Sequence, residues 1–116
     1  MIMGVGVDLV DVARFERQLT ATPRLVERLF AFSERGLEVR SLAARFAAKE
    51  ALVKALGSPE GLSWVDIAVV KNSLGNPDFE LVGLSAQTVA NAGVSKLHLS
   101  LSHDGGMAMA MVVAEA

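Results

Sequence analysis

Apolar and polar positions alternate along parts of the chain with the two-residue period of half-buried strands. Over residues 96–103 every second residue is a leucine, and the turn Asp104-Gly105-Gly106 leads into the apolar run 107–114, which predicts a β-hairpin. The first nine residues are instead almost continuously apolar, which is typical of a buried strand. In all, the pattern predicts strands over residues 1–9, 64–71, 78–82, 96–103 and 107–114.

Helix signals fill the stretches between these strands. Asp11 and the pair Thr22-Pro23 are typical helix starts. Between residues 37 and 56 there is no Pro or Gly, Ala and Leu are frequent, and Gly57 follows as a stop signal, so this is predicted to be the longest helix. The predicted helices cover residues 12–19, 23–30, 37–56 and 85–92. These elements predict the α+β class, with a mainly antiparallel sheet packed against one long helix.

Composition narrows the class of protein. A length of 116 residues fits a single domain over residues 1–116, and 52% apolar residues exclude intrinsic disorder. The formal charge of -2 provides no field to hold nucleic acid, and no apolar stretch approaches the roughly 18 residues of a membrane span. The chain has no Cys and no signal-peptide pattern, so we expect a cytoplasmic location. The apolar content also predicts that some surface meets another subunit.

Four charged residues of the predicted long helix have apolar neighbours. At 100° per residue, Arg45 and Lys49 lie beside or within a stripe of core residues, while Glu50 and Lys54 lie between two apolar faces. One interpretation of Glu50 and Lys54 is an exposed i, i+4 ion pair worth about 0.2–0.5 kcal/mol. The alternative is a ligand-binding set, because charges surrounded by apolar residues must be paired, extend to solvent or meet a ligand.

Asp8 places a carboxylate where the first strand leaves the core. It is either a turn residue beside the next helix or, together with Glu50, half of a hard-cation site of the Mg²⁺ kind that substrate phosphate oxygens complete. Zinc binding by histidines is not expected, because His98 and His103 are five residues apart on a strand and point to opposite faces. Ser102 and His103, beside two glycines, could hold a phosphate or could form only a polar hairpin end.

Three segments carry a more specific pattern: GVDLVDVARF over residues 6–15, RFAAKEALVKALG over 45–57 and SLSHDGGMAMA over 100–110. In this order they resemble the holo-acyl carrier protein synthases, which are small 4′-phosphopantetheinyl transferases, and the FAAKEA core of the second segment is the most specific. The segment around Trp64 and the Gly75-Asn76-Pro77 turn also resemble this family, so the likeness covers essentially the whole chain. Gly36 and the turn over 58–61 depart from the family pattern.

The resemblance implies a Mg²⁺-dependent enzyme of fatty acid biosynthesis. Such an enzyme transfers the 4′-phosphopantetheine arm of coenzyme A to a serine of apo acyl carrier protein and releases adenosine 3′,5′-bisphosphate. The alternative function is a non-catalytic module that binds coenzyme A or a carrier protein without turnover.

The resemblance also implies roles for individual residues. The expected catalytic residues are Asp8, Glu50 and Lys54, of which Asp8 and Glu50 would bind Mg²⁺, or Mn²⁺ in its place. Lys54 would neutralise phosphate charge, and Glu50 would also be a candidate acceptor for the serine proton. The expected holders of the coenzyme A phosphates are Arg45, Lys49, Lys54, Ser102 and His103.

The resemblance also suggests a role for four arginines of the N-terminal third. In helical geometry Arg14 and Arg17 share one face, and Arg24 and Arg28 share another. They are either ordinary solvated residues or, since carrier proteins are acidic, a docking surface for the carrier protein.

The strand over 107–114 is apolar on both faces and needs cover on both. The resemblance implies that this cover comes from a homotrimer with its sites at the subunit boundaries.

Overall fold

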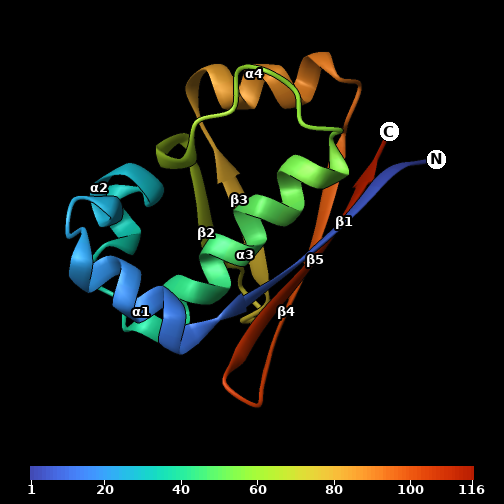
Figure 1. Cartoon of the computed structure of the whole chain (residues 1–116). Helices are drawn as coiled ribbons and strands as arrows, with labels where there is room; N and C mark the ends of the chain where they lie inside the picture. The colour runs from blue at the N-terminus through green and yellow to red at the C-terminus, as the bar shows by residue number, and fades with distance from the viewer.

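Two antiparallel sheets and one long helix, α3, form the framework of the molecule (Figure 1). The computed structural model describes residues 1–116. In chain order the elements are β1 (Ile2–Asp11), α1 (Val12–Ala21), α2 (Leu25–Leu29), the 3₁₀ helix η1 (Phe32–Glu34), α3 (Val39–Ala55), the 3₁₀ helix η2 (Trp64–Asp66), β2 (Ile67–Lys71), β3 (Pro77–Leu81), α4 (Gly83–Asn91), β4 (Lys96–Asp104) and β5 (Met107–Glu115). One sheet has the order β1-β5-β4 and the other pairs β2 with β3. The predicted α+β class with an antiparallel sheet is confirmed.

Helix α3 lies directly on β1 because both contact surfaces consist of small residues. A Cβ added to Gly4 would overlap the carbonyl oxygen of Ala55, and one added to Gly6 would overlap that of Ala51. Only glycine permits so close an approach between the two backbones. Since Asp8 follows on the same face of β1, this contact also holds Asp8 against the helix.

The opposite face of the three-stranded sheet is apolar and exposed. On β1, Val5, Val7 and Leu9 are 50–59% exposed, and on β5 Met109 and Met111 are 38% and 43% exposed. The register pairs Val7 with Met111 and Leu9 with Met109, so these side chains form one continuous surface. The expectation that the first strand is buried is therefore wrong within one chain, where β1 is an edge strand with a single covered face.

Three predicted elements differ in detail from the structure. The predicted strand over 64–71 starts as the 3₁₀ helix η2, because the amide of Asp66 bonds the carbonyl oxygen of Ser63 and closes a turn there. The predicted helix over 23–30 is shorter, because the segment before Leu25 closes a turn with the amide of Leu25 bonded to the oxygen of Thr22. The last predicted helix starts at Gly83 and not at Ser85. No helix has the length and apolar composition needed to cross a membrane.

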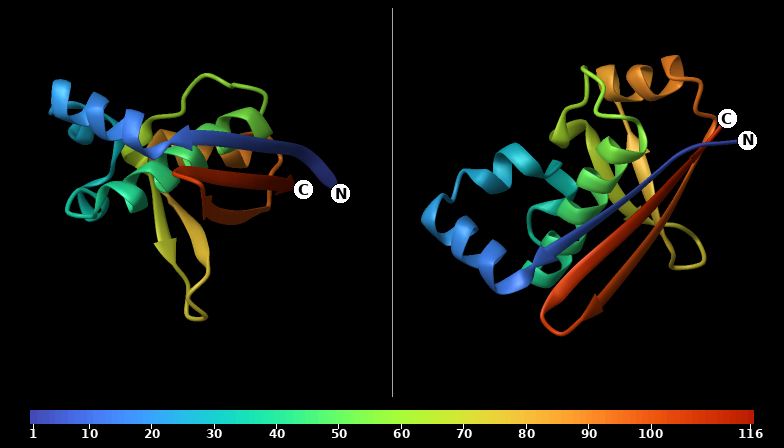
Figure 2. Two further views of the ribbon diagram at one scale, coloured as in Figure 1. Left: turned by 60° about the horizontal axis from the view of Figure 1, so that its bottom comes forward. Right: turned by 45° about the vertical axis from the view of Figure 1, so that its right-hand side comes forward.

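The views in Figure 2 place α1 and α2 together at one end of α3, while α4 lies at the other end. Phe15 of α1 is buried and stacks on Phe46 of α3, with 5.2 Å between the ring centroids, which fixes α1 to the long helix. Asp11 accepts the amide hydrogen of Arg14 and begins α1, as predicted. The turn from β1 into α1 is thereby placed beside α3.

Candidate functional site

Two carboxylates from distant parts of the sequence line one cleft. Asp8 of β1 and Glu50 of α3 both face a cleft of about 160 Å³, whose walls include Phe15 and Phe46. Glu50 reaches it because it lies on the flank of α3, one helical turn after Phe46 and beside the face that packs on β1. The cleft therefore combines acidic groups with an apolar wall.

Lys54 connects the helix to Asp8. Its Nζ donates to Asp8 Oδ1 and to the carbonyl oxygen of Val7, at 3.1 Å in each case. The exposed Glu50–Lys54 ion pair considered from the sequence is not formed within 4.0 Å, because Lys54 reaches across to β1. Asp8 is likewise not a turn residue, since it lies inside β1.

The electrostatics of the cleft show that the two carboxylates affect each other. Partial burial raises the pKa of Glu50 above its ordinary value, the negative charge of Asp8 raises it further, and Lys54 opposes the shift. A cation between the two carboxylates would relieve this repulsion. The raised pKa also makes Glu50 a better proton acceptor than an unperturbed glutamate at neutral pH.

The donor set of the cleft fits a hard cation. No three His, Cys, Asp or Glu side chains come together as a complete protein cage for a metal. Two carboxylates, here Asp8 and Glu50, are nevertheless a common set for Mg²⁺, which retains water ligands and accepts phosphate oxygens from a substrate. The residues therefore fit magnesium and not zinc.

The four arginines expected to dock a partner are all exposed. Arg14 and Arg17 lie on α1, and Arg14 also lines the cleft of Asp8 and Glu50. Arg28 is in the last turn of α2, whereas Arg24 is the residue that precedes this helix and not part of it. The arginines thus belong to α1, to α2 and to the residue before α2, and these two helices lie together at one end of α3 (Figure 2). Arg14 also reaches the candidate site.

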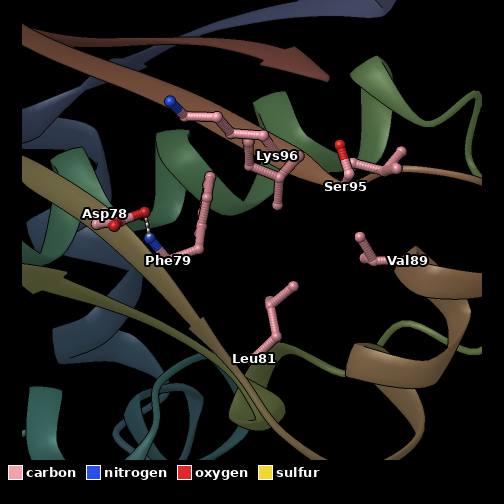
Figure 3. A pocket seen from close by; sticks show the side chains of 8 residues that line it. Asp78, Phe79, Leu81, Val89, Ser95 and Lys96 are labelled. Atoms are coloured by element: carbon pink, nitrogen blue, oxygen red, sulfur yellow. Dashed lines mark hydrogen bonds between the residues drawn. The ribbon is translucent and has the colours of Figure 1, made fainter. Parts of the chain in front are cut away.

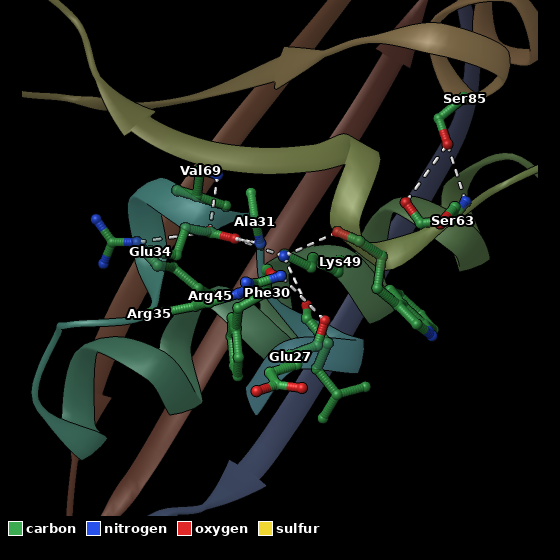
Figure 4. A network of polar contacts seen from close by, with 12 residues as sticks. Glu27, Phe30, Ala31, Glu34, Arg35, Arg45, Lys49, Ser63, Val69 and Ser85 are labelled. Atoms are coloured by element: carbon green, nitrogen blue, oxygen red, sulfur yellow. Dashed lines mark hydrogen bonds and ion pairs between the residues drawn. The ribbon is translucent and has the colours of Figure 1, made fainter. Parts of the chain in front are cut away.

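Lys49 is completely buried, and Figure 4 shows the polar network around it. Its Nζ donates to Glu34 Oε1 at 2.6 Å and to the carbonyl oxygens of Leu29 and Trp64 at 2.7 and 3.1 Å. Burial lowers the pKa of Lys49, and the contact with Glu34 opposes this shift. Since an ammonium has three hydrogens and all three are used, this geometry contradicts the expected role of Lys49 in holding a phosphate.

Glu34 was missed by the sequence reasoning. It is 1% exposed and is the only carboxylate among the fully buried residues. The signal that could have found it was the position of Lys49 in a stripe of core residues, because a buried ammonium requires an anionic partner.

Arg45 lies one helical turn before Lys49 and approaches the same carboxylate. Its Nε lies 3.7 Å from Glu34 Oε2, which is beyond hydrogen-bond distance, and this buried nitrogen has no other partner. This approach to Glu34 is the one polar contact of Arg45 within the chain, and it leaves the terminal guanidinium nitrogens free. The role of Arg45 in holding a phosphate stays a prediction.

Ser102 and His103 do not share a site within one chain. His103 is paired with Ala108 on the face of the sheet toward α3, and its Nε2 lies 3.1 Å from the carbonyl oxygen of Arg40. Ser102 is paired with Met109 on the outer face. His98 also lies on the outer face, so the prediction that the two histidines point to opposite faces is confirmed.

The largest cleft lies elsewhere, between β3, α4 and the start of β4 (Figure 3). It has a volume of about 270 Å³, an apolar lining that includes Phe79 and Leu81, and the charged side chains of Asp78 and Lys96. None of the expected site residues lines it. The pair of Asp8 and Glu50 lies instead in the smaller cleft between β1 and α3.

Comparison with known proteins identifies the family of the chain. A family model described as the 4′-phosphopantetheinyl transferase superfamily matches residues 4–112. The chain belongs to this superfamily. The holo-[acyl-carrier-protein] synthase of Clavibacter michiganensis subsp. michiganensis is 60% identical over 115 residues, which cover 99% of this chain and 97% of that protein. The protein of the same name from Kocuria rhizophila is 57% identical over 116 residues, with coverage of 100% and 94%.

Solved structures of this transferase superfamily share the fold. The holo-[acyl-carrier-protein] synthase of Neisseria meningitidis is 32% identical, with a TM-score of 0.93 and 100% of both chains covered. The Helicobacter pylori enzyme in complex with coenzyme A is 33% identical, with a TM-score of 0.84 and coverage of 96% of this chain and 99% of that chain. The resemblance suggested by the three motif segments is thereby confirmed.

Proposed function

We propose that this chain is a holo-acyl carrier protein synthase. In this proposal residues 1–116 form one transferase domain that moves the 4′-phosphopantetheine arm of coenzyme A to a serine of apo acyl carrier protein and releases adenosine 3′,5′-bisphosphate. The observation that carries the proposal is the meeting of Asp8 and Glu50 at one cleft, with Lys54 bonded to Asp8, in a chain 60% identical to a protein of that name. The reaction would serve fatty acid biosynthesis, and the cytoplasmic location stays a prediction.

Asp8 and Glu50 would hold Mg²⁺, or Mn²⁺ in its place. A bound Mg²⁺ would supply positive charge to the pyrophosphate as the bond to the leaving nucleotide breaks. Lys54, whose ammonium already lies 3.1 Å from Asp8, would place a second cation at the same phosphates. Glu50 would also be a candidate to accept the serine proton, directly or through water. Phe15 and Phe46 would limit access of water from one side.

The remaining contacts of coenzyme A would come from outside this cleft. We assign Arg45 and His103 to its phosphates, because Arg45 has free terminal nitrogens and His103 lies at the open end of β4. Ser102 faces the other side of the sheet and would reach the same ligand only from a neighbouring subunit. Arg14, Arg17, Arg24 and Arg28 would bind the acidic carrier protein.

The exposed outer face of the three-stranded sheet supports a homotrimer with sites at its subunit boundaries. An apolar surface such as that of Val7, Leu9 and Met111 is normally covered by another protein surface. Light scattering gives the subunit number. Mixing inactive Asp8→Asn and inactive His103→Ala proteins should restore some activity after subunit exchange. A monomer would refute the assembly, whereas a trimer without restored activity would refute only the sharing of one site.

The decisive test is incubation with coenzyme A, Mg²⁺ and an apo carrier protein, with mass spectrometry for the added arm. We expect transfer by the wild-type protein and loss of most transfer in Asp8→Asn and Glu50→Gln. Because both residues would act through one ion, the double variant should be about as inactive as the worse single variant. Multiplicative losses would indicate separate roles. Absence of transfer to any carrier would favour the non-catalytic binding module.

A further inference from the structure

Val26 and Leu29 of helix α2 pack against the core, and polar contacts from outside the helix hold its C-terminal end. None of its residues is fully buried. Lys49 Nζ bonds the carbonyl oxygen of Leu29 at 2.7 Å. Arg35 bonds the carbonyl oxygens of Glu27 and Phe30, at 3.3 and 3.2 Å. These two cationic side chains donate hydrogen bonds to carbonyl oxygens at the C-terminal end of α2, where the helix dipole favours positive charge.

The buried pair of Lys49 and Glu34 joins this end of α2 to the rest of the molecule (Figure 4). Besides Leu29, Lys49 bonds Trp64 of η2. Glu34 of η1 accepts the amide hydrogen of Ala31 at 2.9 Å and that of Val69 in β2 at 3.0 Å. A buried pair whose hydrogen bonds are this complete permits few other arrangements of the segments that it connects.

Helix α3, which carries Lys49, also carries Glu50, the candidate catalytic carboxylate. Glu50 follows Lys49 directly in α3, so the rigid helix fixes the position of one relative to the other. Arg28 lies in the last turn of α2, next to the carbonyl that Lys49 bonds. The distance between Arg28 and the cleft therefore depends on where Lys49 holds the end of α2.

We infer that Lys49 and Glu34 are positioning residues that set the place of α2 relative to Glu50, and thereby how the carrier protein presents its serine to the cleft. This inference rests on the proposed function. Neither residue touches a substrate in this role, because both are buried and use their polar atoms within the chain.

Steady-state kinetics separate this role from phosphate binding. The variants are Lys49→Met and, because that change leaves Glu34 without its cationic partner, the double variant Lys49→Met with Glu34→Gln. We expect the KM for the carrier protein to rise by about fivefold or more, the lower end of typical coupling between sites, while the KM for coenzyme A changes little. Arg45→Gln is the matched control from the same helix face. It should raise the KM for coenzyme A and change the KM for the carrier protein little.

A second comparison tests whether Lys49 acts through α2. Arg28→Glu should weaken carrier binding in the wild type but add little in the Lys49→Met background, because α2 is already displaced there. Arg14→Glu is the control, since α1 is attached to α3 through Phe15 and should keep its full effect in both backgrounds.

Amide hydrogen exchange gives a readout without catalysis. In both Lys49 variants the amides of α2 should exchange faster, while those of α1 and β1 stay as in the wild type. An increase in the KM for coenzyme A, unchanged exchange in α2 or loss of the whole fold in the double variant would overturn the inference. If the wild type transfers to no carrier, the proposed function fails, and faster exchange confined to α2 would still support the placement of α2 by this pair.

Discussion

Replacing Gly6 by alanine tests whether the contact between β1 and α3 sets the geometry of the site. Gly6 faces α3, and the new Cβ would overlap the carbonyl oxygen of Ala51. It would also lie 2.8 Å from the amide nitrogen of Ala55. All of these neighbours are backbone atoms of a helix, so no side chain can rotate away. The helix and the strand must separate.

The size of the effect follows from these contacts. Ordinary van der Waals contact begins at 3.4 Å, so Ala55 alone requires a shift of about 0.6 Å, and the overlap with Ala51 requires about 1 Å or more. Overpacking of this kind costs about 1–3 kcal/mol or more, out of a typical total stability of about 5–15 kcal/mol. A displacement of about 1 Å also moves Glu50 and Lys54 away from Asp8, and misplacement by that much can reduce a rate by about 100-fold.

Thermal unfolding and the transfer assay measure the two consequences. The melting temperature of Gly6→Ala should fall by about 4–20 °C, and the residual folded protein should be less active than wild type at a temperature where both are folded. Gly36→Ala is the matched control, because no atom lies within 4 Å of its added Cβ and its φ is outside the left-handed region. Its stability should stay within about 0.5 kcal/mol of wild type. Wild-type stability and activity in Gly6→Ala would refute the reasoning.

Two further predictions concern Glu50 and Arg14. Because the pKa of Glu50 is raised in the folded protein, its carboxylate destabilises the fold once the pH rises through that pKa. Without metal, the melting temperature of Glu50→Gln should therefore be higher than that of wild type at about pH 8, and this difference should vanish at about pH 4. Mg²⁺ should stabilise only the wild type. Equal melting temperatures at both pH values would contradict the pKa shift. Arg14→Glu should raise the KM for the carrier protein and reduce its salt dependence, with little change for coenzyme A; equal weakening of coenzyme A binding would place Arg14 in the nucleotide site.

Much of the fold could be predicted because local patterns determine it. Helix α3 begins two residues after its predicted start and ends one residue before its predicted end. The prediction succeeds because Ala and Leu favour a helix and Gly57 stops it. The hairpin of β4 and β5 follows from alternation and a glycine turn. The 3₁₀ helix η2 was not predicted, because residues 64–71 have the β-branched content of a strand, and the contact of Trp64 with Lys49, 15 residues earlier, leaves no mark in that local pattern.

The candidate site was predictable in part. The motifs named Asp8 and Glu50, but no periodicity says that a strand and a helix pack in the register that brings them to one cleft. The partner of Lys49 was overlooked because Glu34 lies in a segment expected to be a simple break. Strand alternation alone, in contrast, already implied that Ser102 and His103 face opposite sides of the sheet.

The small residues in the contact between β1 and α3 determine how Asp8 and Glu50 are placed relative to each other. Asp8 comes two residues after Gly6 and thus projects from the same face of the strand, while Glu50 comes directly before Ala51 on the helix. The contact between Gly6 and Ala51 therefore sets the separation of the two carboxylates through short and rigid pieces of backbone. A larger side chain at either contact would keep both carboxylates and still disrupt the pair that they form. The glycines of β1 therefore contribute to the geometry of the candidate site as much as the charged residues do.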